Sequence, residues 1–330
     1  MTFPLPKVGT GAAPALALGL SLAGPAMAAD PVAFQLDWTP GGISAAYYLG
    51  LDEGCFADQD IDITISRGYG AADAVTKVAT GVADFSVTDL GTLISSVSET
   101  DAPVKAIMPI VSQNPSSVAV LSDSPIQSLT DLEGHTVGSS VGNSAMTFLP
   151  LGVEMAGADY DKIEKTTADY SALNGLLLQG KIDALASYVT SVVGLNAVAE
   201  GVGKSVRAVY YGDTLDIYNA SIFTSDKMIA TNPDLVARFA AAVQCTYDAA
   251  QADPEAAVDA IVAHVDGMQR PAQAQMVPNS LSFAFDNDVF ASNGYVFDME
   301  RVAHNIAVVN KVTPLSKDLE PADVVYVPAD

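Results

Sequence analysis

The stretch IDITISRGYGAADAVTKVATGVADFSV, residues 61–87, decides the fold class of this chain. Its first five residues, 61–65, alternate apolar and polar side chains, which is typical of a strand with one polar face. Residues 71–80 then carry apolar side chains at helical spacing, and Gly81 stands where a helix would end. Residues 84–87 predict a second short strand. Strand, helix and strand in this order are typical of a mostly parallel sheet that is covered by helices on both faces.

The same alternation continues on both sides of this stretch. Before it, Val32–Leu36 predicts a strand and Ser44–Asp52 a helix, and after it come a helix at Gly91–Val97 and a strand at Val104–Ile110. A second alternating set begins near Ser117, and the pattern becomes purely helical near the C-terminus. The strands expected there are Val118–Leu121, Thr136–Gly138, Ile163–Thr166, Asp183–Ser187, Val206–Tyr210 and Tyr218–Thr224, and the helices are Ser144–Met155, Leu173–Gln179, Ser191–Glu200, Pro233–Ala252, Pro254–His264 and Phe297–Asn310.

This organisation predicts an α/β protein with two lobes, each a mostly parallel sheet flanked by helices. No Gly/Ser-rich linker separates the two sets, so the chain is expected to cross between the lobes twice, near residues 110–113 and 212–217. The first lobe would then comprise residues 30–111 and 214–330, and the second lobe residues 112–213. Two crossovers leave a cleft between the lobes, which is where such α/β proteins bind small ligands.

Residues 1–29 have the layout of an export leader. Lys7 is their only charged side chain, an apolar run extends from Ala12 to Leu22, and small residues around Ala28 and Ala29 offer a cleavage site. This layout is typical of a secretory signal peptide. No cysteine stands at the cleavage site, so we expect a freely diffusing periplasmic protein and not a lipid-anchored one.

Charge and cysteine content exclude several kinds of function. The chain has 39 acidic and 15 basic side chains and no cluster of Lys or Arg, so nucleic acids and anionic membranes are not expected partners. Neither the two cysteines nor the three histidines follow a metal-ligand spacing, and no nucleotide or other cofactor motif is present. We expect Cys55 and Cys245 to be buried free thiols, with a disulfide between them as the alternative.

Loops that follow the strands of the first lobe are candidates for ligand contacts, because the carboxyl ends of strands in such sheets face the cleft. Trp38 offers a ring for stacking beside the carboxylate of Asp37; alternatively, Trp38 fills the core and Asp37 caps the turn. Asp89 is a second candidate acceptor, or simply the N-cap of the next helix. The candidates in this lobe are Asp37, Trp38, Thr39, Tyr69, Gly70, Thr88 and Asp89.

The second lobe adds a loop of small residues, 138–144, that opens a helix. Unpaired N–H groups at such a helix start could hold a carboxylate, a sulfonate or a polar ring substituent. The end of the strand at 183–187 and the return crossover near residue 218 could complete the walls of the cleft. The candidates in these segments are Ser139, Asn143, Ser144, Ser187, Tyr188 and Tyr218.

Several of these stretches give the chain a resemblance to a known family. They are LDWTP (36–40), YLGLDEGCF (48–56), RGYGAAD (67–73), GVADF (81–85), SLTDLEGHTVG (128–138) and LQGKIDA (178–184). In this order they resemble the periplasmic substrate-binding proteins of ABC importers, in the branch that handles thiamine pyrimidine precursors, sulfonates and nitrate. The resemblance implies a two-lobed hinge protein of the type II binding-protein fold. Such a protein closes on a solute and presents it to a membrane permease and its ATPase subunits.

One departure from the family pattern lies in the first cleft loop. Pyrimidine-precursor members usually carry Asn and His after the Trp-x-Pro step, whereas this chain has Gly41-Gly42-Ile43-Ser44. Ser44 stands at the His position and is therefore included among the candidate ligand contacts.

An enzymatic function is not expected. The chain has no Gly-x-Ser-x-Gly motif, its histidines lack a catalytic context, and the loop histidine and cysteine-rich segment of fungal pyrimidine-forming relatives are absent. We predict a monomer that captures a small nitrogen-containing heteroaromatic solute. Trp38, with Tyr69 or Tyr188, would stack on the ring, Asp37 and Asp89 would accept hydrogen bonds, and the helix start near residue 144 would donate them. A sulfonate such as taurine, or nitrate, is the alternative cargo.

Overall fold

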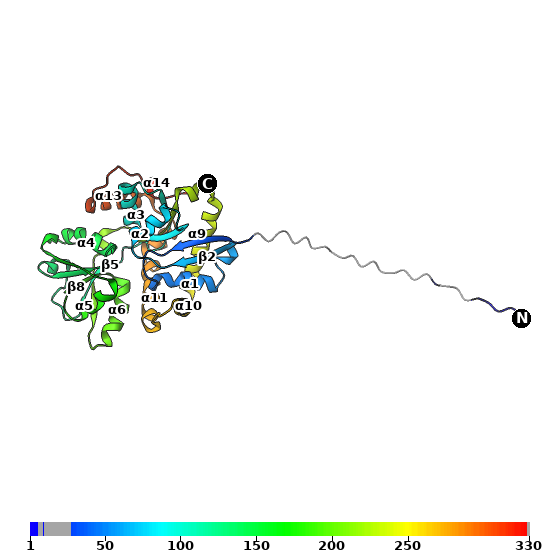
Figure 1. Cartoon of the computed structure of the whole chain (residues 1–330), viewed down its shortest axis with the longest axis horizontal. Coiled ribbons are helices and arrows are strands. Elements are labelled where there is room, and N and C mark those ends of the chain that lie inside the picture. The colour runs from blue at the N-terminus through cyan, green and yellow to red at the C-terminus, as the bar shows by residue number, and fades with distance from the viewer. Residues whose placement is uncertain (6–8, 10–27, 329–330) are drawn as a thin grey trace.

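The computed structural model describes residues 1–5, 9 and 28–328, so most of the leader expected at residues 1–29 lies outside the described residues. The described chain forms two parts side by side, each built on one five-stranded sheet (Figure 1). Lobe 1 denotes the first sheet with the helices that pack on it, and lobe 2 denotes the second sheet with its helices. The two-lobed α/β architecture predicted from the sequence is confirmed.

The sheet of lobe 1 has the strand order β2-β1-β3-β10-β4. β1 is parallel to β2 and β3, with Phe34 opposite Ile65 and Phe85, whereas β10 runs antiparallel between β3 and β4. The strands are β1 (Asp30–Gln35), β2 (Ile61–Ser66), β3 (Phe85–Asp89), β4 (Val104–Pro109) and β10 (Ala220–Ser225). All strands except β10 therefore point the same way.

The sheet of lobe 2 repeats this arrangement in the order β7-β6-β8-β5-β9, with β5 as its one antiparallel strand. In each sheet the antiparallel strand, β5 or β10, is the first strand after the chain has crossed from the other lobe. The strands are β5 (Ser116–Leu121), β6 (Thr136–Ser139), β7 (Glu164–Thr167), β8 (Ala184–Tyr188) and β9 (Val206–Tyr210). The prediction of mostly parallel sheets is confirmed, and the crossovers explain the exceptions.

Helices cover both sheets, and local signals in the sequence account for many of their ends. Gly81 follows α2 with a φ of +76°, which is the glycine stop expected there, and Asp89 caps α3. The longer helices are α1 (Ala45–Asp52), α2 (Ala71–Ala79), α3 (Leu90–Thr100), α4 (Ser144–Met155), α5 (Tyr170–Leu178), α6 (Val189–Glu200), α9 (Pro233–Ala252), α10 (Pro254–His264), α11 (Arg270–Phe285) and α13 (Met299–Val312). The shorter ones are α7 (Gly212–Leu215), α8 (Asp226–Thr231), α12 (Asp288–Asn293) and α14 (Pro321–Val324), with 3-10 turns at Gly42–Ser44, Ala57–Gln59, Leu129–Leu132 and Tyr160–Lys162.

Helix α11 occupies a region, residues 265–296, for which the sequence pattern predicted no element. Pro271 lies in its first turn, where no N–H partner is lost, but Pro278 lies in its interior. Its buried residues include Gln273 and Ser280 as well as Val277, so the helix lacks the apolar stripe that normally reveals a surface helix. α11 packs against α10 of lobe 1 and α6 of lobe 2, and it lies between the two lobes (Figure 1).

An aromatic core under β1 and β3 holds lobe 1 together. The rings of Phe85 and Phe239 stack with their centroids 4.0 Å apart, and Tyr47 meets Phe34 and Tyr247 edge-on at 4.8 and 5.4 Å. These five side chains are almost completely buried. Burial stabilises each by about 1.5–3 kcal/mol relative to exposure. Since Tyr47 belongs to α1 and Tyr247 to α9, this core also fixes those two helices relative to each other.

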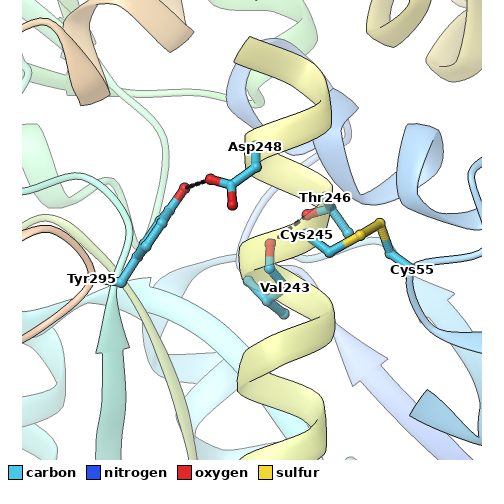
Figure 2. The surroundings of a disulfide bond; sticks show 6 residues. All are labelled: Cys55, Val243, Cys245, Thr246, Asp248 and Tyr295. Carbon is cyan, nitrogen blue, oxygen red and sulfur yellow. Dashed lines mark hydrogen bonds between the residues drawn. A yellow bond between two sulfur atoms is a disulfide. The ribbon is translucent and has the colours of Figure 1, made fainter. Parts of the chain in front are cut away.

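Cys55 and Cys245 form a disulfide, so the expectation of two buried free thiols was wrong (Figure 2). Cys55 is buried, whereas Cys245 is exposed. Helices α1 and α9 pack so closely that a Cβ on Gly50 would lie 2.1 Å from Cγ2 of Thr246, and the two cysteine Cα atoms are 5.7 Å apart. The pairing depends on this packing between segments 190 residues apart, which the cysteine spacing does not reveal.

Candidate functional site

A cavity of about 360 Å³ lies between the lobes. In lobe 1 its wall comes from the loop after β1, from β3 and the start of β10, and from α1, the start of α2, α9 and α11. In lobe 2 it comes from the start of α4, the end of β8 and the start of α6. The two crossover segments complete it. The residues of the predicted site that belong to this wall are Asp37, Trp38, Thr39, Ser44, Asn143, Ser144, Ser187 and Tyr188.

The remaining predicted residues, Tyr69, Gly70, Thr88, Asp89, Ser139 and Tyr218, are not part of the wall. Tyr69 is 67% exposed, and its ring centroid lies 4.6 Å from the guanidinium carbon of Arg67. Tyr218 is fully buried, and its hydroxyl accepts a hydrogen bond from the N–H of Asp298 at 3.0 Å. The structure therefore places neither ring against the cavity.

Gly70, Thr88 and Ser139 contribute to the packing of the protein and not to the cavity wall. A Cβ on Gly70 would lie 3.7 Å from Cα of Gly142, so the two lobes meet here backbone against backbone. Thr88 is buried within β3. Ser139 is buried at the end of β6, and its hydroxyl donates to the carbonyl oxygen of Ser140 at 3.1 Å. None of these three positions offers a side-chain group to the cavity.

Asp89 joins the two lobes. Its carboxylate accepts hydrogen bonds from the N–H and the hydroxyl of Thr92 at 2.7 and 2.8 Å, which makes it the N-cap of α3. The same carboxylate accepts a hydrogen bond from the hydroxyl of Ser144, at the start of α4 in lobe 2, at 2.6 Å. Nearby, the Phe148 ring of lobe 2 occupies the place of a side chain at Gly91, 2.3 Å from the Cβ position. The alternative reading of Asp89 as an N-cap is confirmed, and the residue also holds the lobes together.

The side-chain polar groups of Ser44 and Asn143 form hydrogen bonds with backbone groups of the protein. Ser44 Oγ accepts a hydrogen bond from the N–H of Gly41 at 2.9 Å and donates to the carbonyl oxygen of Gly41 at 3.1 Å. Asn143 Oδ1 accepts from the N–H of Met146 at 3.1 Å, and its Nδ2 donates to the carbonyl oxygen of Ala186 at 3.3 Å. The helix start that was predicted to hold an anion is therefore already capped by a side chain.

Asp37 is the one charged side chain on the described wall of the cavity. Burial raises the pKa of Asp37 from 3.8 to about 7, and the negative charge of Asp89 adds to the shift, whereas the backbone N–H groups of Asp37 and Trp38 oppose it. Near neutral pH, the free protein therefore contains both the acid and the carboxylate. A ligand that brings a cation or an N–H donor to this position favours the carboxylate.

Three tyrosines on the wall are influenced by the charge of this carboxyl group and keep their hydroxyl protons. Burial is the largest cause that raises the pKa of Tyr47, Tyr188 and Tyr247, and the charge of Asp37 contributes to each shift. All three residues belong to the wall. They can exchange hydrogen bonds with a ligand, but they are not ionised near neutral pH.

Helix α11 supplies part of the wall that no sequence pattern predicted. Gln273, Met276, Ser280 and Phe283 recur every three or four residues, so they share one face of the helix, and all four line the cavity. That spacing was the available signal, but the mixed polar and apolar character of the residues concealed it. The wall also includes Gly41 and Asn219, which lie in the first cleft loop and the return crossover indicated by the sequence. The unpredicted wall residues outside α11 include Tyr47, Val111, Pro115, Thr190, Ser191 and Tyr247.

The wall offers no positive charge and no metal site. None of the residues described along it is Lys, Arg or His. In the part of the chain that the structure describes, no group of three or more His, Cys, Asp or Glu side chains could hold a metal ion. No helix among the same described residues has the length and apolar character needed to cross a membrane.

Two curated relatives match most of this chain. A formylaminopyrimidine-binding protein of Halalkalibacterium halodurans is 23% identical over 263 residues, which cover 78% of each chain. The riboflavin-binding protein RibY of Chloroflexus aurantiacus is 25% identical over 284 residues, which cover 82% of this chain and 79% of that protein.

Solved structures share the fold at low sequence identity. The periplasmic aliphatic sulphonate binding protein SsuA from Escherichia coli matches with a TM-score of 0.71 and 14% identity, over 91% of this chain and 93% of that one. The desulfurization enzyme DSZB matches with a TM-score of 0.55 and 13% identity, over 87% and 94%. The fold of this chain is therefore that of two-lobed periplasmic binding proteins, and an enzyme shares it.

The sequence profile described as NMT1/THI5 like matches residues 43–257. The matched segment begins in the loop after β1, includes all of lobe 2's sheet and ends in α10. It therefore contains Ser44, Asn143, Ser144 and Tyr188 of the cavity wall. On this match, the chain belongs to the NMT1/THI5-like family.

Proposed function

We propose that this protein captures a small nitrogen-containing heteroaromatic molecule between its lobes and delivers it to a membrane permease and its ATPase subunits. Its family, its fold and two relatives that are named as binding proteins support a binding role. The leader expected at residues 1–29 supports export to the periplasm, and we propose that the protein acts there as a monomer. The Cys55–Cys245 disulfide also fits that compartment, because oxidising conditions preserve such bonds.

We infer the chemical class of the cargo from the charge of the cavity wall. Asp37 is its one charged side chain among the described residues, and a carboxylate binds N–H donors and cations while repelling anions. Trp38 adds a ring to the same wall, where it can contact an aromatic ligand. The cavity volume of about 360 Å³ lies near the lower end of the range for small-molecule pockets, which favours a single ring over a larger fused system.

A sulfonate or nitrate is less well supported as cargo. An anion would meet the carboxyl group of Asp37 without any Lys, Arg or His on the described wall. The start of α4, which could hold an anion by its N–H groups, is capped by Asn143, and the hydroxyl of Ser144 donates to Asp89. The side-chain donors of Asn143 and Ser144 at this helix start are therefore engaged within the protein.

Binding without catalysis is part of this proposal. Both cysteines are joined in the disulfide, and the described wall holds no histidine that could act as a base. The hydroxyl of Ser44 donates to a backbone carbonyl, and that of Ser144 donates to the N-cap carboxylate of α3. Ser44 therefore has no hydrogen-bonded base, and the carboxylate that Ser144 faces is already bound by the N–H and the hydroxyl of Thr92.

Thermal-shift and calorimetric titrations of the leader-free protein test the proposal. The probes are formylaminopyrimidine, riboflavin, taurine and nitrate. A compound present at 100 times its Kd should stabilise the fold by about 2.7 kcal/mol. We expect formylaminopyrimidine to raise the melting temperature most, and Asp37→Asn to weaken its binding at least tenfold. A response to taurine or nitrate without any response to the heteroaromatic probes would contradict the proposed cargo. Turnover of formylaminopyrimidine in the same samples, followed by mass spectrometry, would contradict a purely binding role.

A further inference from the structure

The side chain of Gln273 is held at the cavity in one defined orientation. It lies on the cavity face of α11 and is only 5% exposed. Its Oε1 accepts a hydrogen bond from the backbone N–H of Gly42 at 3.0 Å. A backbone N–H can only donate, so it must face the oxygen and not the nitrogen of the amide. This contact therefore identifies which amide atom of Gln273 is the oxygen and which is the nitrogen.

The nitrogen of the same amide is left for a ligand. With Oε1 facing Gly42, Nε2 lies beside Gly41, 3.5 Å from the position of a Cβ there. Because residue 41 is a glycine, no side chain covers Nε2. Among the described residues, no hydrogen bond is formed by Nε2, although Gly41 and Gln273 both line the cavity. Nε2 is not one of the fully buried polar atoms that lack a partner, so it is accessible from the cavity, where a ligand acceptor can take the place of water.

Three candidate ligand contacts in other loops use their donors within the protein. The hydroxyl of Ser44 donates to Gly41, the amide of Asn143 to Ala186, and the hydroxyl of Ser144 to Asp89. The oriented amide on α11 is not committed in this way. Its donor therefore complements Asp37, which supplies an acceptor on the same wall.

We propose that Gln273 is a specificity-determining residue that donates a hydrogen bond from Nε2 to an acceptor atom of the ligand, such as a ring nitrogen or a carbonyl oxygen. This inference rests on the proposed function and deepens it. The ligand must present a donor or cation to Asp37 and an acceptor to Gln273. An aromatic amine without a ring acceptor satisfies only the first requirement, whereas an aminopyrimidine satisfies both.

The test compares two probes on matched variants at pH 8. 4-Aminopyrimidine carries an amino donor and ring-nitrogen acceptors, and aniline carries the amino donor alone. Gln273→Glu keeps an oxygen for the N–H of Gly42 but loses the amide donor. Gln273→Met removes the donor without adding charge and serves if the glutamate variant does not fold. Gln269→Glu is the control. Gln269 is exposed at the N-cap of α11, so this substitution makes the same change of charge on the same helix but away from the cavity wall.

Calorimetry should show that both Gln273 variants bind 4-aminopyrimidine about 10–100-fold more weakly, while their affinity for aniline changes less than threefold. Gln269→Glu should match the wild type for both probes. Equal losses for the two probes would mean that Gln273 only holds the Gly41–Gly42 loop, and this would overturn the inference. Unchanged binding of 4-aminopyrimidine to the variants would overturn it as well. If the wild-type protein binds no nitrogen heteroaromatic compound at all, the proposed function fails first, and the inference fails with it.

Discussion

Replacing Cys245 with serine tests how the first and last parts of lobe 1 are joined. The disulfide closes a loop of 190 residues that contains the whole sheet of lobe 2. For a loop of this length, the chain-entropy model gives a stabilisation of about 5 kcal/mol. Cys245 is the better position for the change, because it is exposed while Cys55 is buried. Serine at 245 therefore removes the bond without opening a cavity.

We expect the free energy of unfolding to fall by about 3–5 kcal/mol, since measured effects of disulfides are commonly smaller than the model value. The unfolding entropy of about 2 cal/mol/K per residue, over roughly 300 residues, converts this to a lower Tm by about 5–8 °C. Guanidinium unfolding followed by tryptophan fluorescence and far-UV circular dichroism measures both the free energy and the m-value. The m-value should increase, because an uncrosslinked denatured chain exposes more surface.

The controls separate the disulfide from the site. Wild-type protein treated with dithiothreitol should match the serine variant, and the variant should not respond to dithiothreitol. Ligand affinity should change little, because the ring of Tyr247 is also fixed by Tyr47 and Phe285, at 5.4 and 5.6 Å between centroids. Two titratable thiols in the denatured, unreduced wild-type protein would refute the pairing. A loss of stability below about 1 kcal/mol would refute the argument from loop length.

Three further changes test the site and the contact between the lobes. Asp37→Asn removes a carboxyl group whose pKa is raised by burial from 3.8 to about 7. Between these two values the folded wild type keeps a proton that the unfolded chain releases. The unfolding free energy of the wild type should therefore fall, relative to that of the variant, by up to about 4 kcal/mol between pH 4 and pH 8. Urea denaturation measures this, and a difference that does not change with pH would contradict it. Asp89→Asn removes a charge that raises the pKa of Asp37, so an NMR titration of the Asp37 carboxyl should shift to lower pH, and an unmoved midpoint would assign the shift to burial alone. Gly194→Ala places a methyl group 2.4 Å from Sδ of Met276, so ligand affinity measured by calorimetry should fall about tenfold, and adding Met276→Ala should restore most of it. A loss without restoration would place the cause in α6 itself.

Periodicity was sufficient to predict the fold because the sheets are built from local units. The strand–helix–strand pattern of residues 61–87 corresponds to β2, α2 and β3, and the same alternation predicted the second sheet. The antiparallel course of β5 and β10 follows from the crossovers and has no local signal. Helix α11 was missed because Pro278 and its polar buried face remove the signals on which helix prediction depends. The disulfide was missed because it reports packing between α1 and α9 and not spacing along the chain.

The sequence predicted the location of the site more successfully than the side chains that are available to a ligand there. Strand-end loops do meet at the cavity, as the carboxyl-end rule requires, and Asp37, Trp38 and Tyr188 lie on its wall. Which polar groups remain available for a ligand depends on hydrogen bonds that no loop sequence reveals. Asp89 illustrates this, since its carboxylate is used by its own helix and by Ser144 of the other lobe. A carboxylate at a strand end can therefore accept a hydrogen bond from a ligand only if neighbouring protein groups do not already occupy it.

The glycines of this chain explain why the contacts between its lobes are difficult to predict from sequence and what the departure in the first cleft loop achieves. The lobes meet where a side chain is absent: Phe148 fills the place above Gly91, and Sδ of Met276 fills the place above Gly194. The methyl group of the same methionine lies 3.8 Å from the Cβ position of Gly42, which has a φ of +53° that favours glycine. A larger residue at 42 would also meet the hydroxyl of Ser280 at 2.9 Å and push α11 away. The glycine loop therefore does more than remove a ligand contact. It allows α11 to approach, and with α11 comes a buried amide that the loop itself does not contain.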